Sequence, residues 1–366
     1  AFVARHDYSP FSSEKVPPRE VTIIDGVRVI FFNVLPFRKR QSLARILGWV
    51  QFELRLFFMK TQDVPKPDFI VASSLSILSI LNGFAFRWRT KAKLIFEIRD
   101  VWPMVLTHNG GYSRFNPIVL VIQLIEWLGY KYSDAIVATM PNLGEHVENV
   151  LGFPRKVQCI PMGVADELLN GKEISLPANL VDSFPKDKFI VTYVGSIGVD
   201  NALDPLFEAI RILQHDTDIV FRIFGKGDLL DKYKKDCADL DNVFFGGAIP
   251  NNMVQTVLNS SSLLFLATHP TAVLKYGQSL NKLIDYMYSG KPVLAAHSGF
   301  QSMINEAECG YFVPAGDPQS LCKEIITLSH LSKSELNKVG ARGRTWLLEN
   351  RLYDRLAGSY IDVFND

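Results

Sequence analysis

The feature that most constrains the fold is a regular alternation of short apolar segments with longer amphipathic ones. The apolar segments are about four to six residues long, and those between them have the periodicity of helices. Such a chain forms parallel β-sheets covered by helices on both faces, so the expected fold class is α/β. The expected strands are 27–33, 69–72, 93–98, 135–139, 157–160, 190–194, 220–224, 243–245, 263–267, 293–296 and 311–313.

The alternation is interrupted once, near the middle of the chain. A length of 366 residues predicts about two domains. Residues 161–187 lack the periodic pattern and contain Pro177 and Pro185. We therefore expect two domains, each with a parallel sheet, and a last amphipathic helix. The expected bounds are 1–165 for the first domain, 166–188 for a linker, 189–350 for the second domain and 351–366 for the helix.

Composition narrows the functional classes. The net charge of +1 gives no indication of nucleic-acid binding. The four cysteines are scattered without a CxxC pair, which predicts reduced thiols, a cytosolic setting and no structural metal. The longest strongly apolar run, 117–128, contains Gln123 and Glu126 and is shorter than the ~20 residues of a membrane-spanning helix. Walker, GxSxG and HExxH motifs are absent, which argues against kinases, hydrolases and metalloproteases.

Chemistry is concentrated in residues 275–296, KYGQSLNKLIDYMYSGKPVLAA. A polar loop at 275–281 is expected to open a helix from about 279 to 289, and Gly290 to end it. A helix that begins after such a loop presents free N–H groups and a positive dipole end, which together bind anions.

Lys282 and Asp285 lie three residues apart, so they share one face of this helix. Lys282 would neutralise a phosphate, and Asp285 would accept hydrogen bonds from the hydroxyls of a ribose. The alternative is an ordinary exposed ion pair between these two side chains.

Glycines follow three strands of the second half, in the segments 195–198 (GSIG), 225–228 (GKGD) and 246–247 (GG). Glycine at the carboxyl end of a parallel strand lets a ligand approach the backbone, where such sheets bind nucleotides. Ordinary turn formation is the alternative for each segment taken alone.

A polar group also follows a strand of the first half. Glu97 and Arg99 alternate with apolar residues at the end of strand 93–98, and Asp100 comes next. These side chains would bind a sugar or a phosphate of an acceptor. A buried arginine–carboxylate pair that fixes the loop is the alternative.

Two segments mix basic and aromatic residues, at 38–60 and at 84–93. A basic, aromatic, amphipathic helix lies on anionic membranes, so both segments predict contact with a membrane surface. The alternative is a core helix with a solvated basic edge.

The segment 275–296, with the GSIG and GKGD turns before it, resembles the donor domain of retaining family-4 glycosyltransferases. FEIRDVWP, preceded by PDFIVASS, resembles the bacterial surface-polysaccharide branch, which includes colanic-acid, O-antigen and fucosaminyltransferase-like enzymes. The resemblance covers roughly residues 20–350. It implies a GT-B fold, with two Rossmann-like domains facing across a cleft and the last helix packing back on the first domain.

The resemblance also implies a reaction and its partners. The N-terminal domain would bind a saccharide acceptor, and the C-terminal domain a nucleotide sugar with UDP as the nucleotide. The two basic, aromatic segments indicate that the acceptor is lipid-linked. Transfer would proceed with retention, without metal or cofactor, in surface-polysaccharide (O-antigen or capsule) synthesis on the cytoplasmic face of the cell membrane.

Site residues follow from the same resemblance. Lys282, Asp285, Arg99 and Asp100 would be the catalytic residues. The residues expected to bind the nucleotide sugar are Gly195, Ser196, Gly225, Lys226, Ala248, Ile249, Gly277, Gln278, Ser279, Leu280, Asn281, Lys282 and Asp285.

The chain departs from the family pattern at four places. PMGV at residues 161–164 stands where a Pro-Asn-Gly-Val element is expected. Gly277 stands where the first acid of the motif is expected, and Ser196 where an arginine is expected. No opening strand with its glycine-rich loop is expected before residue 20. Two other functions stay open: a sugar-nucleotide 2-epimerase of the same architecture, and a non-catalytic nucleotide-sugar-binding protein.

Overall fold

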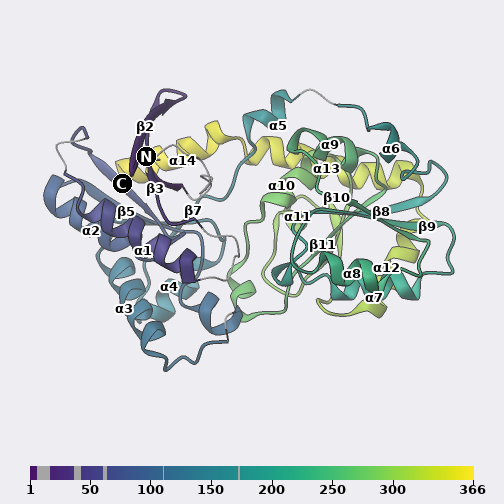
Figure 1. The fold of residues 1–366 in the computed structure, drawn as a ribbon, viewed down its shortest axis with the longest axis horizontal. Helices are drawn as coiled ribbons and strands as arrows, with labels where there is room; N and C mark the ends of the chain where they lie inside the picture. Colours follow the sequence, from purple (N-terminus) through teal and green to yellow (C-terminus); the bar gives the residue numbers. More distant parts are fainter. Residues whose placement is uncertain (6–16, 37–42, 61–63, 110, 172–173) are drawn as a thin grey trace. The chain divides into compact units, whose positions relative to one another are not determined.

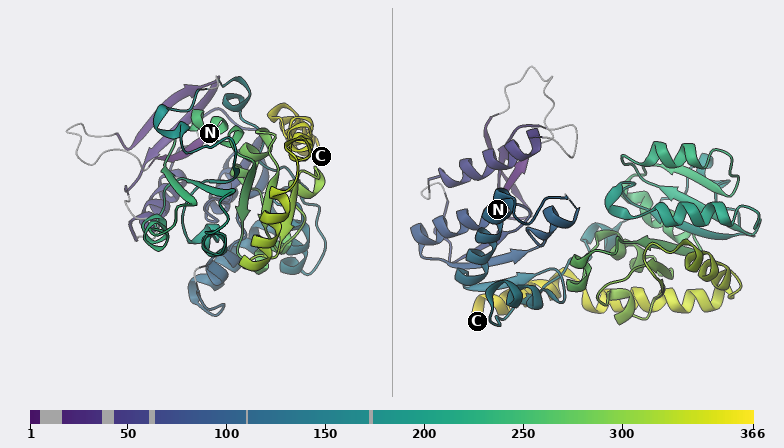
Figure 2. Two further views of the ribbon diagram at one scale, coloured as in Figure 1. Left: turned by 90° about the vertical axis from the view of Figure 1, so that its right-hand side faces the viewer. Right: turned by 90° about the horizontal axis from the view of Figure 1, so that it is seen from below.

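The computed structural model describes residues 1–5, 17–36, 43–60, 64–109, 111–171 and 174–366. The chain forms two compact units (Figures 1 and 2). The first contains residues 1–138 and 147–158, and the second contains residues 139–146 and 159–366.

The first unit is built on two sheets. Its strands are β1 (Phe2–Arg5), β2 (Arg19–Ile24), β3 (Val27–Asn33), β4 (Phe69–Ser73), β5 (Lys93–Ile98), β6 (Ala135–Ala138) and β7 (Gln158–Cys159). Its helices are α1 (Leu43–Phe57), α2 (Ser79–Thr90), the π-helical η2 (Val105–Asn109), α3 (Pro117–Tyr132) and α4 (Leu143–Leu151), through which the unit boundary passes. The larger sheet has the order β4-β5-β6-β7, and β5 pairs parallel with both β4 and β6.

Close packing holds the helices on this sheet. Leu94 and Phe96 of β5 are fully buried. Glycines in α2 and α3 face them: a Cβ on Gly83 would lie 2.8 Å from the Leu94 side chain, and one on Gly129 would lie 2.7 Å from the Phe96 ring. These glycines let the helix backbones approach the strand closely.

The smaller sheet, of order β1-β3-β2, corrects two expectations. The strand β2 was not predicted, and it pairs antiparallel with β3. Asp25 and Gly26 between them both have positive φ, 50° and 79°, as in a type I′ hairpin turn. The Asp-Gly dipeptide between alternating apolar residues was the available signal. A strand also precedes residue 20, because β1 pairs parallel with β3; residues 6–16 after it lie outside the described chain.

The second unit is a single six-stranded parallel sheet. Its strands are β8 (Phe189–Val194), β9 (Ile219–Phe224), β10 (Val243–Gly247), β11 (Leu263–Ala267), β12 (Val293–Ala296) and β13 (Gly310–Val313). Its helices are α5 (Asp166–Asn170), α6 (Ala178–Val181), η3 (Val199–Asn201), α7 (Asp204–Ile212), α8 (Leu230–Asp236), α9 (Asn251–Asn259), η4 (Ala272–Tyr276), α10 (Asn281–Tyr288), α11 (Met303–Glu306), α12 (Pro318–Ser329), α13 (Lys333–Asn350) and α14 (Tyr353–Asn365).

The strand order β10-β9-β8-β11-β12-β13 is the order 3-2-1-4-5-6 of dinucleotide-binding folds, with all pairs parallel. One apolar core forms between the sheet and α7, α8 and α12, and the other between the sheet and α9, α10, α11 and α13 (Figure 1). The order of the strands reverses between β8 and β11, and ligands bind such sheets at that point.

The segment expected to be a linker, 166–188, packs on the second unit instead. It contains α5 and α6, and its Phe184 stacks on Phe224 of β9 with ring centroids 6.0 Å apart. Leu180 and Phe184 share an apolar cluster with Ile190 of β8. Residues 172–173 of this segment lie outside the described chain.

Candidate functional site

The turns that follow β8, β9 and β10 are hydrogen-bonded to one another. The Gly195 N–H donates to the Phe224 carbonyl at 3.0 Å, and the Gly225 N–H donates to the Gly247 carbonyl at 2.7 Å. The Ile197 N–H donates to the Lys226 carbonyl at 2.9 Å. These bonds make one backbone layer at the carboxyl edge of the sheet.

Glycine is required in this layer by close approach. Gly225 has a φ of 143°, and a Cβ there would lie 1.8 Å from the Gly195 carbonyl oxygen. A Cβ on Gly227 would lie 2.1 Å from the Ile197 carbonyl oxygen. Ordinary turn formation and ligand binding, the two interpretations of these glycines, are therefore compatible here. The glycines allow tight turns, and they also leave the backbone uncovered by side chains.

We expect Gly225→Ala to destabilise the protein by about 1–3 kcal/mol, since the clash is with backbone that cannot rotate away. Gly198→Ala is the matched control, because Gly198 has an ordinary φ of −137° and nothing lies within 4 Å of a Cβ there. Urea unfolding of both variants measures the difference; equal midpoints would contradict the close approach.

A pocket of about 280 Å³ opens on this layer. It is lined by Val194, Gly195, Ser196, Gly225, Lys226, Ala248, Ile249, Asn251, Val254, Lys282, Asp285 and Tyr286. Eight of the residues expected to bind a nucleotide sugar thus lie around one cavity: Gly195, Ser196, Gly225, Lys226, Ala248, Ile249, Lys282 and Asp285.

The helix α10 brings Lys282 and Asp285 to this pocket. Its opposite face buries Leu283, Ile284 and Met287 in the core. Tyr286 fixes the helix to β8, because its hydroxyl donates to the Val194 carbonyl at 3.0 Å and accepts from the Val194 N–H at 2.9 Å. The N-cap, Leu280, gives no side-chain hydrogen bond to the first turn, so the side chain of the cap does not compete with a ligand for its N–H groups.

The Lys282 ammonium is held by neutral groups only, among the residues that the structure describes. It donates to the Tyr193 hydroxyl at 2.9 Å and to Oδ1 of Asn201, and it lies 4.8 Å from the centre of the Tyr193 ring. Burial lowers the pKa of Lys282 to about 8. The ammonium is next to the glycine turn, 3.2 Å from where a Cβ on Gly195 would be.

Asp285 carries the opposite charge to Lys282, and its carboxyl group is half-buried. Burial raises its pKa to about 6, and within the described part of the chain no hydrogen bond or opposite charge offsets this rise. The expected alternative, an exposed ion pair of Asp285 with Lys282, is therefore excluded. A cation and an anion stand in one pocket without neutralising each other, which costs stability unless a ligand pairs with both.

Other predicted residues lie elsewhere. Gly277, Gln278, Ser279, Leu280 and Asn281 precede α10 and do not line the pocket. The helix begins at Asn281 rather than near 279, and η4 occupies the start of the expected polar loop. The positive φ of Gly277, 89°, turns the chain beside Pro141, and the Ser279 hydroxyl accepts from the Met162 N–H at 3.2 Å.

Arg99 and Asp100 belong to the first unit, directly after β5. Both backbone N–H groups donate to the Ser74 hydroxyl, at 2.9 Å and 3.4 Å. Asp100 is exposed and Arg99 is half-buried. Their proposed role toward an acceptor stays a prediction.

Sequence reasoning missed the residues that hold Lys282. Tyr193 and Asn201 carry no motif, and only the position of Tyr193 two residues before Gly195 marked it as close to the site. Asn251 and Tyr286, which line the pocket, were equally unmarked.

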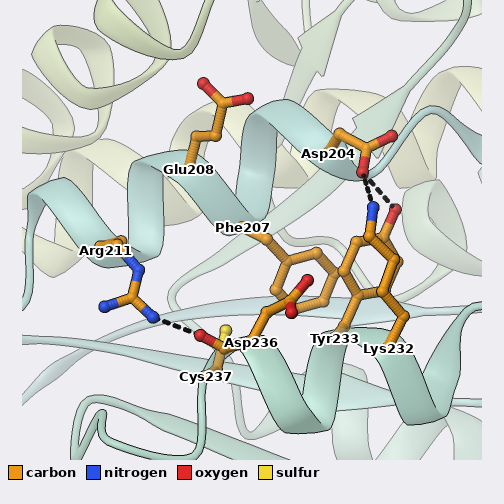
Figure 3. A pocket seen from close by; sticks show the side chains of 8 residues that line it. All are labelled: Asp204, Phe207, Glu208, Arg211, Lys232, Tyr233, Asp236 and Cys237. Carbon is orange, nitrogen blue, oxygen red and sulfur yellow. Dashed lines mark hydrogen bonds and ion pairs between the residues drawn. The ribbon is translucent and has the colours of Figure 1, made fainter.

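A larger pocket of about 410 Å³ lies between α7 and α8 (Figure 3). Its two cations are already paired: Lys232 donates to Asp204 at 2.9 Å, and Arg211 donates to the backbone of Asp236 and to the Asp239 carboxylate. Tyr233 also donates to Asp204, at 3.1 Å, and stacks on Phe207. Among its described lining residues, this pocket therefore offers no unpaired cation to a phosphate, unlike the smaller one. Among the described residues, no cluster of His, Cys, Asp and Glu has the composition of a metal site.

The residues that line the pocket at α10 lie in a part of the chain that matches a known sequence family. Residues 188–330 match the family described as Glycosyl transferases group 1. The chain is 26% identical over 202 residues to the amylovoran biosynthesis glycosyltransferase AmsK of Erwinia amylovora. That match covers 54% of this chain and 48% of AmsK, so the chain spans about half the length of this curated relative.

Solved structures show the same fold along the chain. The sucrose-phosphate synthase of Thermosynechococcus elongatus superposes with a TM-score of 0.70 at 15% identity, covering 100% of this chain and 87% of that one. Anabaena HepE, in complex with UDP and glucose, superposes with a TM-score of 0.65 at 13% identity, covering 93% and 87%. The predicted GT-B fold is confirmed, and the matches together support a glycosyltransferase.

Proposed function

We propose that this protein is a retaining glycosyltransferase that moves a sugar from a UDP-sugar to a lipid-linked saccharide during synthesis of a bacterial surface polysaccharide. The observation that carries the proposal is the pair of unneutralised groups, Lys282 and Asp285, in one pocket at the carboxyl edge of a Rossmann-type sheet. A nucleoside diphosphate sugar carries both an anion and a ribose diol, so it complements both groups.

The similar proteins support UDP as the nucleotide and polysaccharide synthesis as the pathway. HepE was solved with UDP and glucose, and AmsK is named for amylovoran biosynthesis. By extension we propose a UDP-sugar as donor here, with Gly225, Lys226, Ala248 and Ile249 beside the base and Gly195 and Ser196 beside the diphosphate. No further cofactor is proposed.

In the proposed reaction the protein mainly stabilises the negative charge of the leaving diphosphate. The bond from the anomeric carbon to the diphosphate oxygen breaks, and the acceptor oxygen bonds to that carbon on the same face. The acceptor proton passes to the departing phosphate oxygen. Lys282 and the first turn of α10 stabilise the negative charge that develops there, as donors of an oxyanion hole do. These donors take the place of a divalent ion, so we propose transfer without metal.

We propose that the first unit binds the acceptor. Arg99 and Asp100 remain our candidates for contact with its sugar or phosphate, and we propose the cytoplasmic face of the cell membrane as its location.

A thermal-shift panel of nucleotide sugars tests the proposal. A ligand at ~100 times its dissociation constant adds about 2.7 kcal/mol to the free energy of unfolding, so the correct donor should stand out from the others. UDP-sugars are expected to raise the melting temperature most. No shift with any nucleotide sugar would contradict the proposal. A rearranged nucleotide sugar formed without acceptor would favour the epimerase, and tight binding without any transfer would favour the non-catalytic protein.

A further inference from the structure

The helix layer of the first unit exposes apolar side chains on its outer surface. On α1 and just after it, these are Ile46, Leu47, Val50, Leu54, Phe57 and Phe58. At 100° per residue they fall within an arc of roughly 120°, one side of the helix. The opposite side packs Leu56 and the following Met59 in the core. One side of α1 is thus a core side, as the alternative expected, and its exposed side is apolar.

The neighbouring helices continue this surface. α2 contacts both α1 and α3, so the three lie side by side (Figure 1). The side chain of Trp88 on α2 is 75% exposed, about as much as that of Phe58, which is 76% exposed. On α3 the exposed apolar residues are Ile118, Leu120, Val121 and Leu124, preceded by Phe115. We call the exposed apolar residues of α1, α2, α3 and their flanks the apolar layer.

Acidic side chains are nearly absent from the apolar layer, and the exposed Asp134, just after α3, pairs with Arg87 of α2 at 2.9 Å. The helices α1, α2 and α3 contain only two acids, Glu53 and Glu126, which are 7% and 2% exposed. Glu53 accepts from Asn82 at 2.7 Å, and Glu126 accepts from the Tyr130 hydroxyl at 2.9 Å. Both carboxyls are thus turned into the protein.

Basic side chains stand beside its aromatic rings. The Arg89 guanidinium lies 5.2 Å from the centre of the Phe57 ring, and Arg114 lies 4.8 Å from that of Phe115. The Lys131 ammonium lies 4.3 Å from the centre of the Trp127 ring. In each pair an aromatic ring and a cation lie next to each other. Side chains at the boundary between the acyl chains and the headgroups of a bilayer combine apolar and cationic groups in the same way.

We propose that the apolar layer docks on an anionic lipid bilayer, with its aliphatic side chains in the acyl boundary and its arginines and lysine on the headgroups. Apolar side chains beside basic ones, with no exposed acid within α1, α2 and α3 themselves, complement anionic lipid rather than a protein surface of mixed charge. The structure has no helix, within the described residues, that is long and apolar enough to span a membrane. The inference extends the proposed function, on which its biological meaning rests, by naming the surface that would meet the membrane of the lipid-linked acceptor.

Vesicle co-sedimentation of the full chain tests the proposal. We expect pelleting at low salt with vesicles that contain phosphatidylglycerol, and much less with phosphatidylcholine alone or at high salt. The triple variant Leu47→Ser/Val50→Ser/Leu54→Ser should weaken partitioning at least ~100-fold, because three side chains no longer leave water. All three residues are exposed, so the variant should fold.

The matched control replaces three exposed apolar residues of the second unit, Val181→Ser/Ile212→Ser/Ile326→Ser, and should pellet like the wild type. A wild type that stays in the supernatant with anionic vesicles, or a triple variant that still pellets, would overturn the proposal. So would a dimer in sedimentation velocity that the triple variant abolishes, if the wild type does not bind vesicles, because a second copy would then cover the layer. The thermal shift by UDP-sugars should be equal in the wild type and the triple variant, which separates this proposal from the proposed function.

Discussion

Lys282→Ala is expected to reduce turnover ~100-fold or more while leaving the fold intact. The ammonium lies beside Gly195, 3.2 Å from where a Cβ on that residue would be, and lines the pocket at α10. Removing one donor of an oxyanion hole costs about 3 kcal/mol in transition-state stabilisation, which is the size of the expected loss. The measurement is transfer of labelled sugar from the donor that gives the largest thermal shift.

Two further variants make this result specific. Lys282→Met keeps the apolar stem of the side chain and should lose as much activity as the alanine variant, because the charge is what acts. Lys323→Ala removes an exposed lysine from α12 and should keep full activity. Turnover within about threefold of the wild type in Lys282→Met would contradict the role of the charge.

The affinity for a UDP-sugar is expected to have a bell-shaped dependence on pH with its maximum between about 6 and about 8. Below that range Asp285 is protonated and no longer accepts from the ribose as a carboxylate. Above it Lys282 loses the proton that neutralises the diphosphate. Affinity should fall about tenfold per pH unit on either side. Titration calorimetry with an intact UDP-sugar is suitable, because its diphosphate does not titrate in this range.

The variant Asp285→Asn tests whether Asp285 causes the fall in affinity on the acidic side of that pH profile. The variant should bind about 10- to 100-fold more weakly at neutral pH, the effect of a lost hydrogen bond to a charged group. Its affinity should no longer fall below pH 6. A profile of unchanged shape in this variant would assign the acidic limb to another group.

The same variant should stabilise the protein without ligand. The folded pKa of Asp285 is raised from 3.8 to about 6. The folded state therefore binds the proton more tightly than the unfolded state, and stability falls as pH rises through that window. At neutral pH the ionised carboxyl lacks a partner, so asparagine should raise the melting temperature while weakening the ligand. This combination is typical of a binding group and not of a structural one.

The sequence predicted the parts of this fold that follow from local pattern. The ends of β8, β9 and β10 could be placed along the chain from apolar runs and glycines. Parallel strands necessarily bring those ends to one edge, so Gly195, Gly225 and Gly246 could be grouped from the sequence alone.

What the sequence did not predict depends on contacts between distant residues. Lys282 donates to Tyr193 and Asn201, which lie 89 and 81 positions away. No periodicity marks such a contact, because the partners are polar residues in two different elements. Nor did the pattern predict the path of Gly277–Asn281, where the backbone turns beside Pro141 and Met162 before the helix begins; the contact of these residues with a nucleotide sugar stays a prediction.

A crystal structure of the full chain grown with UDP tests the central claim most directly. The account predicts a phosphate oxygen about 2.8 Å from Nζ of Lys282 and both ribose hydroxyls on the Asp285 carboxylate. The base should lie against Lys226 and Ile249. UDP bound elsewhere, or a pocket that stays empty at saturating UDP, would contradict it.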